Sequence, residues 1–246
     1  RLKTQKGKDA LVQELQNLHQ TLLAYDGDEF AQSRPAWMDK TCPVLVSKRI
    51  LSHQHKDVRL MACCCVVEML RVYAPEAPFS DQQLKVAFEA LIIELRGLQH
   101  PERAAFEKVS GILESLAVLK SCVLVVGMAE EGNDELVTAL FQVLLQSVRP
   151  EHSDQTRRYM VDVMRACLED FEGPVPDSLI EILMEAVLNF KAEDDEDDIE
   201  DAKDAVSRAA GKGLDCILLS ATISTLTIST ALCRDARSGS VRDPRS

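Results

Sequence analysis

The segment from residue 58 to residue 78 constrains the fold more than any other part of this 246-residue chain. Its first part is densely apolar, and the apolar residues recur at the i, i+3, i+4 and i+7 positions of one helical face. They are Val58, Met61, Ala62, Cys65, Val66, Met69, Leu70 and Tyr73. The spacing predicts a core helix with Asp57 as its N-cap. We expect it to end at Ala74, because the following proline disfavours helical backbone.

A short acidic loop follows the predicted helix. The residues of this loop, together with the tyrosine before it, are Tyr73, Ala74, Pro75, Glu76, Ala77 and Pro78. The two prolines fix the backbone on either side of Glu76. The residues alone allow two interpretations of this loop: a connector that only ends the helix, or a stiff acidic surface that another polypeptide binds.

Composition favours layers of helices and argues against a nucleic-acid-binding surface. Hydrophobic residues make up 46% of the chain but aromatic residues only 4%, so the core must be filled by aliphatic, cysteine and methionine side chains. The net charge of −12 is the opposite of what a protein needs to bind phosphate backbones. The eight cysteines lie mostly in apolar helical runs and are predicted to be reduced core residues.

Further helical faces follow along the chain. Apolar spacing predicts helices over residues 11–22, 35–51, 84–95, 106–116, 136–148, 159–171 and 179–190. Pro43 implies either a kink or two short helices in the second of these segments. Ser80 and Gln83 fit a capping box before the third, and Asn133 is the expected N-cap of the fifth.

The helices come in pairs, which predicts an all-α fold. No segment of the first 190 residues alternates apolar and polar side chains as a strand would. The pairs repeat at roughly 35 to 50 residues, the period of HEAT-like units that bury their open faces on their neighbours. Asp57, Val58 and Arg59 lie where such units place an acid, a valine and a basic residue. We therefore predict a HEAT-like α-solenoid of antiparallel helical hairpins over residues 1–190.

The last part of the chain differs from the repeats. Residues 191–213 include the acidic run EDDEDDIEDAKD and are predicted to form a solvated loop and a helix start, with an acidic docking tail as the alternative. Residues 214–246 are predicted to form a poorly ordered or atypical tail. Residues 214–233 are uncharged after Asp215, which raises the possibility of a membrane span. Seven serines and threonines between Ser220 and Thr230 argue against that span.

No motif in the sequence predicts metal binding, cofactor binding or catalysis. His53, His55 and the run of cysteines at 63–65 offer zinc ligand types, but three consecutive helical residues point about 100° apart and cannot meet one ion. Buried, helix-packing cysteines are the better interpretation. The sequence has no GxSxG, no phosphate-binding GxxxxGK[ST] and no dinucleotide-binding GxGxxG. We therefore predict no metal, no cofactor and no enzymatic activity.

Three blocks carry a resemblance to a known family. The first is Arg71 and Tyr73 followed by APEAP, the second is ILESLA at residues 112–117, and the third is a helix with DQTRRYMVDVM followed by GPVP at residues 173–176. In this order they resemble the N-terminal HEAT-repeat region of the sister chromatid cohesion regulator of the precocious-dissociation-of-sisters type, the fifth of that name. The resemblance covers roughly residues 11–190.

The resemblance implies a nuclear, non-enzymatic scaffold associated with cohesin. Its partners would be Wapl-like and sororin-like regulators and a cohesin acetyltransferase, with no membrane and no direct nucleic-acid contact. In the family, the loop receives short Tyr-Ser-Arg segments, and its acid faces the partner's arginine. Glu76 stands where the family more usually has aspartate, and Tyr73 would offer an aromatic wall.

The resemblance leaves two questions open. The kleisin-contacting repeats of the family lie mostly beyond this stretch, so the resemblance leaves open whether it retains kleisin binding. Family members are far longer, so we expect a fragment or an incomplete gene product. The alternative function is a generic HEAT or armadillo adaptor for another complex, which would share the architecture but not the cohesin partners.

Overall fold

The computed structural model of the chain describes residues 7–25, 35–130 and 132–191. All regular elements in these ranges are helices, and no strand is present in them. The helices are α1 (Lys8–Leu23), α3 (Ala36–Leu45), α4 (Lys48–Leu51), α5 (Lys56–Tyr73), α6 (Asp81–Leu95), η1 (Arg96–Gln99), α7 (Phe106–Leu119), η2 (Ser121–Val123), α8 (Leu124–Glu130), α9 (Glu135–Ser147), α10 (Asp154–Asp170) and α11 (Asp177–Lys191).

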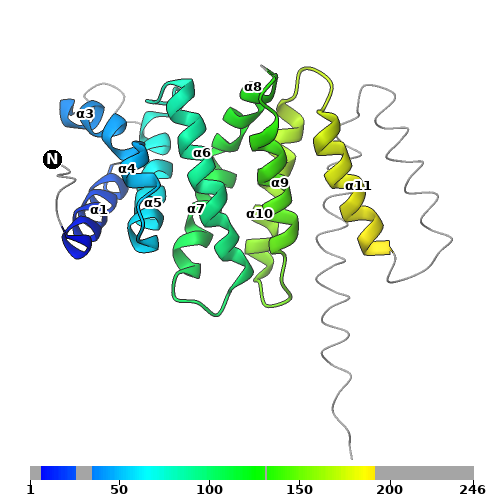
Figure 1. The fold of residues 1–246 in the computed structure, drawn as a ribbon, viewed down its shortest axis with the longest axis horizontal. Helices are drawn as coiled ribbons and strands as arrows, with labels where there is room; N and C mark the ends of the chain where they lie inside the picture. The colour runs from blue at the N-terminus through cyan, green and yellow to red at the C-terminus, as the bar shows by residue number, and fades with distance from the viewer. Residues whose placement is uncertain (1–6, 26–34, 131, 192–246) are drawn as a thin grey trace, which may run out of the picture.

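The helices form two layers that run the length of the molecule (Figure 1). In one layer α1 packs on α5, α5 on α7 and α7 on α10. In the other layer α4 packs on α6, α6 on α9 and α9 on α11. Each pair buries the apolar face that the previous pair leaves open, which is how a helical-repeat protein builds a continuous core. The predicted all-α solenoid is therefore confirmed.

Helix α5 is enclosed by its neighbours and not buried along a single face. Fourteen of its 18 residues are buried, including the three consecutive cysteines that point in different directions. The reason is its position, because α1 and α7 flank it and α3, α4 and α6 cover it. A helix that is apolar on all sides belongs in the middle of a core. The prediction of a core helix was right, and the restriction to one face was wrong.

Two predicted helix starts were displaced. Helix α5 begins after His55, whose backbone is extended, so Asp57 lies in the first turn and is not the N-cap. The N-cap of α9 is Asp134 and not Asn133, whose side-chain oxygen accepts a hydrogen bond from Lys85 Nζ at 3.0 Å. In both cases the expected capping side chain is bound by a distant lysine. The capping box of α6 is confirmed, with Ser80 N donating to Gln83 Oε1 at 3.0 Å.

The breaks between helices have local causes. The segment 35–51 forms two short helices, α3 and α4. Pro43 lies inside α3, and the break between the two helices comes after α3, at Ser47. Lys120 has a left-handed backbone with φ of 52°, which ends α7. The chain then bends by 82° into η2 and α8.

No single described helix is both long and apolar enough to cross a bilayer. The bent pair at residues 106–119 and 121–129 meets the criterion by length and composition only. The acidic run and the 214–233 segment lie outside the described residues.

The cysteines of the described part are core residues, as predicted. Cys42, Cys63, Cys64, Cys65, Cys122 and Cys167 are all free and buried. Burial raises the pKa of Cys42 and of Cys64 to about 11. It also raises the pKa of Cys63 and Cys65. Cys216 and Cys233 lie outside the described residues.

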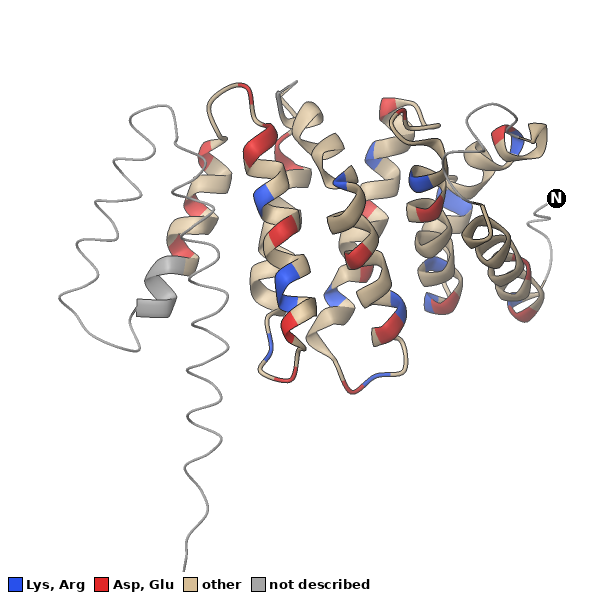
Figure 2. Cartoon of the chain, turned by 180° about the vertical axis from the view of Figure 1, so that it is seen from behind, with Lys and Arg blue, Asp and Glu red and all other residues tan. Residues whose placement is uncertain are grey.

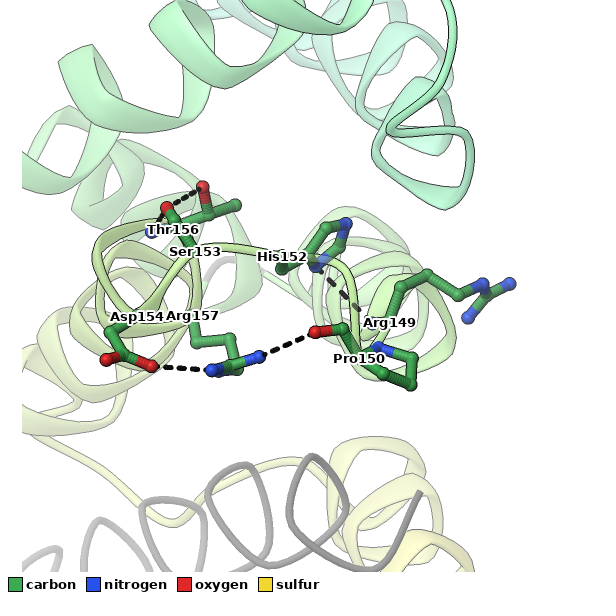
Figure 3. Close-up of polar contacts among 7 residues, drawn as sticks. All are labelled: Arg149, Pro150, His152, Ser153, Asp154, Thr156 and Arg157. Carbon is green, nitrogen blue, oxygen red and sulfur yellow. Dashed lines mark hydrogen bonds and ion pairs between the residues drawn. The ribbon is translucent and has the colours of Figure 1, made fainter. Parts of the chain in front are cut away.

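A buried histidine in the turn between α9 and α10 connects two neighbouring repeats (Figure 3). His152 is only 3% exposed, its Nε2 lies 2.7 Å from the carbonyl oxygen of Leu98, and its ring stacks on Phe106 with centroids 5.6 Å apart. The backbone N–H of Arg149 donates to Nδ1 at 3.4 Å, so the proton is assigned to Nε2, which donates to Leu98. We call the contacts of Leu98, Phe106 and His152 the histidine joint.

The helix after the histidine joint has a conventional start. The Ser153 hydroxyl caps α10 by accepting a hydrogen bond from the backbone N–H of Thr156 at 3.1 Å. Beside it, Arg157 binds Asp154 at 2.5 Å and the carbonyl oxygen of Pro150 at 3.3 Å (Figure 3). These contacts hold the residues on either side of His152 in place.

Candidate functional site

The predicted docking loop lies on the surface between α5 and α6. Ala74, Pro75 and Glu76 are exposed, whereas Ala77 and Pro78 are half-buried. The chain leaves α5 abruptly at Ala74, with φ of −49° and ψ of 142°, and the Ala74–Pro75 peptide bond is cis. After the loop, Phe79 is buried, so the loop is fixed to the core at both ends.

Tyr73 is a core residue and not an exposed wall of the loop. It is 5% exposed, and its hydroxyl donates a hydrogen bond to Asp39 Oδ1 of α3 at 2.5 Å. Burial and the Asp39 carboxylate raise the pKa of Tyr73, so the phenol is protonated. The expectation that the ring offers an aromatic surface to a partner is therefore wrong. Tyr73 instead connects the base of the loop to α3.

Arg71 attaches the same turn of α5 to α1. Its Nε donates to Glu68 Oε2 at 2.7 Å, and its two terminal nitrogens donate to the carbonyl oxygens of Tyr25 at 2.9 Å and Leu22 at 2.8 Å. A cation at the C-terminal end of α1 also opposes the negative end of the helix dipole. Glu68 is 5% exposed, so its charge depends on Arg71 for compensation.

Together these contacts form what we call the α5 joint: Asp39, Glu68, Arg71 and Tyr73, with the carbonyl groups of Leu22 and Tyr25. Its bonds join residues 34 to 49 positions apart in the sequence, apart from the local pair Glu68 and Arg71. Sequence reasoning placed Tyr73 on the apolar face of this helix, singled out Arg71 only through the family resemblance, and missed Asp39 and Glu68. No local pattern marks either acid, because both are recognised by what they contact after folding.

The predicted repeat triplet connects α5 to its neighbours. Asp57 pairs with Lys8 of α1 at 2.8 Å, and Val58 is fully buried. Arg59 Nε donates to Glu94 Oε1 of α6 at 3.1 Å, and Arg59 Nη1 donates to the carbonyl oxygen of His53 at 2.8 Å. Burial raises the pKa of Glu94, and Arg59 opposes that shift. These three residues hold the solenoid together and do not line the loop.

The electrostatics of the described part suit a local acidic contact. In the view of Figure 2, positions of acidic and basic residues alternate along the described helices. Glu76 is exposed on the loop, and small alanines lie on either side of the Pro75-Glu76 pair. An exposed carboxylate can accept two parallel hydrogen bonds from a guanidinium group, and a stiff backbone loses little freedom on binding.

A small pocket lies between α1 and α3. Its volume is about 350 Å³. It is lined by Glu14, Asn17, Leu18, Thr21, Tyr25, Trp37 and Thr41. Trp37 is 38% exposed there. The sequence analysis treated Trp37 as an apolar residue of a helix and did not predict a pocket.

The candidate metal ligands do not gather. In residues 7–25, 35–130 and 132–191, no three His, Cys, Asp or Glu side chains come together as the ligands of one ion would. The rings of His53 and His55 lie 5.4 Å apart near the start of α5. Cys63, Cys64 and Cys65 are instead packed inside the core.

The chain is similar to known proteins over most of its length. The family model described as sister chromatid cohesion protein PDS5 matches residues 9–224. The chain is 32% identical over 181 residues to PDS5 homolog A of Arabidopsis thaliana. The matched stretch covers 72% of this chain and 10% of the relative. It is 30% identical over 156 residues to pds5 of Schizosaccharomyces pombe, covering 62% and 13% of the two chains.

A solved structure has the same fold. A chain in the structure of the Pds5–Scc1 complex superposes with a TM-score of 0.68 at 20% sequence identity, covering 94% of this chain and 31% of that chain. The present chain spans only about a tenth of the length of the two curated relatives above. The similarity therefore concerns one stretch of a much longer kind of protein.

Proposed function

The chain belongs to the PDS5 family of sister chromatid cohesion proteins, and from this premise we propose that it is a non-enzymatic, cohesin-associated scaffold. It acts in the nucleus, on chromosomes, and docks regulators of cohesion on its helical-repeat surface. The observation that carries the proposal is the exposed acidic loop at the end of an enclosed helix. Such a loop has a fixed shape and an available charge.

The proposed partners are Wapl-like and sororin-like regulators and a cohesin acetyltransferase. Support comes from the family's role in sister chromatid cohesion and from the solved neighbour, which was determined in complex with Scc1. The chain spans 31% of that neighbour, so we assign no Scc1-binding residue to this stretch. A generic helical adaptor for another complex is the competing function.

In the proposed mechanism the loop binds an arginine of a short Tyr-Ser-Arg segment. Glu76 supplies the carboxylate, and its charge-assisted bonds to the guanidinium orient the segment. Ala74 and Ala77 leave space for the incoming side chain, while Pro75 and Pro78 limit the entropy lost on binding. Tyr73 is excluded from direct contact by its burial and acts through the backbone that follows it.

Reversal of the charge at Glu76 tests the mechanism. We expect Glu76→Arg to weaken binding of a fluorescent Tyr-Ser-Arg peptide at least about tenfold in an anisotropy titration, because it replaces attraction with repulsion. Glu76→Asp should retain binding. Glu169→Arg, an exposed acid at the end of α10, is the matched control and should bind like the unchanged chain. A peptide with Glu in place of Arg should recover affinity for Glu76→Arg. Unaltered binding by Glu76→Arg would contradict the proposal.

Affinity purification of the full-length gene product separates the two candidate functions. Recovery of cohesin subunits with the intact product, identified by mass spectrometry, supports the cohesin-associated scaffold. Consistent recovery of a different complex without cohesin subunits supports the generic adaptor.

A further inference from the structure

We propose that Asp39 of α3 is the positioning residue of the docking loop, holding it in place through the Tyr73 hydroxyl without touching the partner. The inference rests on the proposed function in assigning a partner to the loop. The positional part concerns the unbound chain and can be measured without any partner.

The contact between α3 and the base of the loop is short and specific. Asp39 Oδ1 accepts a hydrogen bond from the Tyr73 hydroxyl at 2.5 Å, a distance typical of a charge-assisted O–H···O⁻ bond. The Cys42 thiol, one turn further along α3, donates to Met69 Sδ of α5 at 3.9 Å and so holds the same two helices together. Tyr73 is 5% exposed, so its ring cannot swing outward without opening the core. One face of α3 therefore fixes the phenol.

The position of Tyr73 determines where the loop begins. Tyr73 is the last residue of α5, and the chain turns out of the helix at the next residue. Glu76 lies only three residues beyond Tyr73, and the prolines restrict the backbone between them. A displacement of the phenol is therefore passed on to the carboxylate of Glu76. Loop residues with little freedom of their own cannot compensate for a displaced base.

Arg71 cannot replace this contact, because it binds a different helix. Its bonds reach Glu68 and the carbonyls at the end of α1, not α3. In addition, α3 is a ten-residue helix with a proline inside it, so it has few backbone bonds of its own to hold its orientation. Asp39 thus orients the loop and α3 relative to each other.

Amide hydrogen exchange of residues 70–74, the hydrogen-bonded last turn of α5 from which the loop departs, tests the positional claim in the unbound 246-residue chain. Asp39→Ala and Tyr73→Phe each remove the bond, and each should speed exchange in this segment roughly tenfold. Asp39→Asn keeps an acceptor oxygen and should stay within about threefold of the unchanged chain. The double variant Asp39→Ala/Tyr73→Phe should exchange no faster than either single variant, because both act on one bond.

The chain contains a matched control of the same chemistry. The Tyr159 hydroxyl of α10 donates to Glu114 Oε1 of α7 at 2.7 Å, away from the loop. Tyr159→Phe and Glu114→Ala remove a tyrosine–carboxylate bond between neighbouring helices and should leave exchange of residues 70–74 unchanged. If they speed it as much as Asp39→Ala does, the effect is a general loss of stability, and the proposal is overturned.

Peptide binding then distinguishes positioning from direct contact. Asp39→Ala and Tyr73→Phe should each weaken binding of the Tyr-Ser-Arg peptide by the same factor, roughly three- to tenfold. The double variant should bind no more weakly than either single variant. If Asp39→Ala lowers peptide affinity by the same factor in a Tyr73→Phe chain as in the unchanged chain, the Asp39 carboxylate binds the peptide directly. That result overturns the inference. Unchanged exchange in Asp39→Ala would also overturn it. If the unchanged chain binds no peptide but Asp39→Ala still speeds exchange of residues 70–74, the inference is supported and the proposed function is contradicted.

Discussion

The α5 joint and the histidine joint both connect helices of neighbouring repeats, but one uses charge and the other avoids it. At the α5 joint, Arg71 and the buried Glu68 are oppositely charged, and Arg71 also binds the end of α1. At the histidine joint, a neutral imidazole reaches the carbonyl oxygen of Leu98 and stacks on an aromatic ring. The two joints are therefore sensitive to different disturbances.

The difference follows from where each joint lies. The α5 joint is at the base of an exposed loop, where Arg71 keeps part of its side chain in solvent and a charge can be retained. His152 is almost fully buried, and an imidazolium there would need a second acceptor where Nδ1 already receives a donor. The comparison teaches that the core of this helical repeat holds a charged side chain where an oppositely charged one lies beside it, as Arg71 does beside Glu68, and a neutral one elsewhere, as at His152.

The largest expected effect comes from removing the cation of the α5 joint. Arg71→Met should lower the free energy of unfolding by about 3 kcal/mol, because Glu68 is left buried without its partner and the carbonyls of Leu22 and Tyr25 lose a donor. Urea unfolding followed by circular dichroism measures the change. Arg157→Met is the matched control, since its partner Asp154 is 92% exposed, and should cost well under about 1 kcal/mol.

A second variant checks the physical reason. Adding Glu68→Gln to Arg71→Met removes the uncompensated charge and should recover part of the lost stability. Equal costs for Arg71→Met and Arg157→Met would show that the α5 joint is no stronger than a surface ion pair.

An intermediate effect is expected from acid at the histidine joint. Burial lowers the pKa of His152 below the ordinary value of 6.5, so the unfolded chain binds a proton more readily than the folded one. The contribution is fully present above pH 6.5 and is lost as the pH falls through 6.5 toward the folded pKa. Between pH 7.5 and pH 5.5 the unchanged chain should therefore lose stability through this group.

Glutamine at position 152 isolates that contribution. His152→Gln can still donate to the carbonyl of Leu98 but does not titrate, so its urea midpoint should fall less between the two pH values. Burial also lowers the pKa of His19, which acts in the same direction. The double variant His19→Gln/His152→Gln should therefore have the flattest pH dependence. A His152→Gln slope identical to that of the unchanged chain would contradict the assignment.

The smallest effect is expected at a charged contact that is not buried. Lys8 and Asp57 lie 2.8 Å apart but are 38% and 48% exposed, so solvent and salt screen them. Lys8→Gln should leave the urea midpoint unchanged within error, and adding 0.5 M salt should affect both chains equally. A clear loss of stability would show that charge alone, without burial, strengthens these joints.

The sequence predicted the helices well because their signal is local. Apolar residues repeating every three or four positions place α5, α6, α7, α9 and α10, and the capping box of Ser80 and Gln83 was found from spacing alone. Helix starts failed where a distant residue intervened: Asp57 binds Lys8, 49 positions away, and Asn133 binds Lys85. Capping preferences describe isolated helices, and these lysines belong to other helices.

The candidate site was predictable only in part, for the same reason. The prolines and Glu76 are contiguous, so an exposed stiff acidic loop could be expected from the sequence. The role of Tyr73 could not, because its burial depends on α3 and its partner Asp39 lies 34 residues earlier. An aromatic residue beside a loop has the same local pattern whether it faces solvent or the core.

The buried thiols of the core have a practical consequence for labelling. Maleimide and iodoacetamide react with thiolate at accessible sulfur, and the six described cysteines are enclosed, with a raised pKa for Cys42, Cys63, Cys64, Cys65 and Cys167. Within residues 7–25, 35–130 and 132–191, a cysteine introduced at the exposed Ala74 would be the first to take up a dye. Movement of the loop could then be followed by fluorescence without first replacing the buried cysteines.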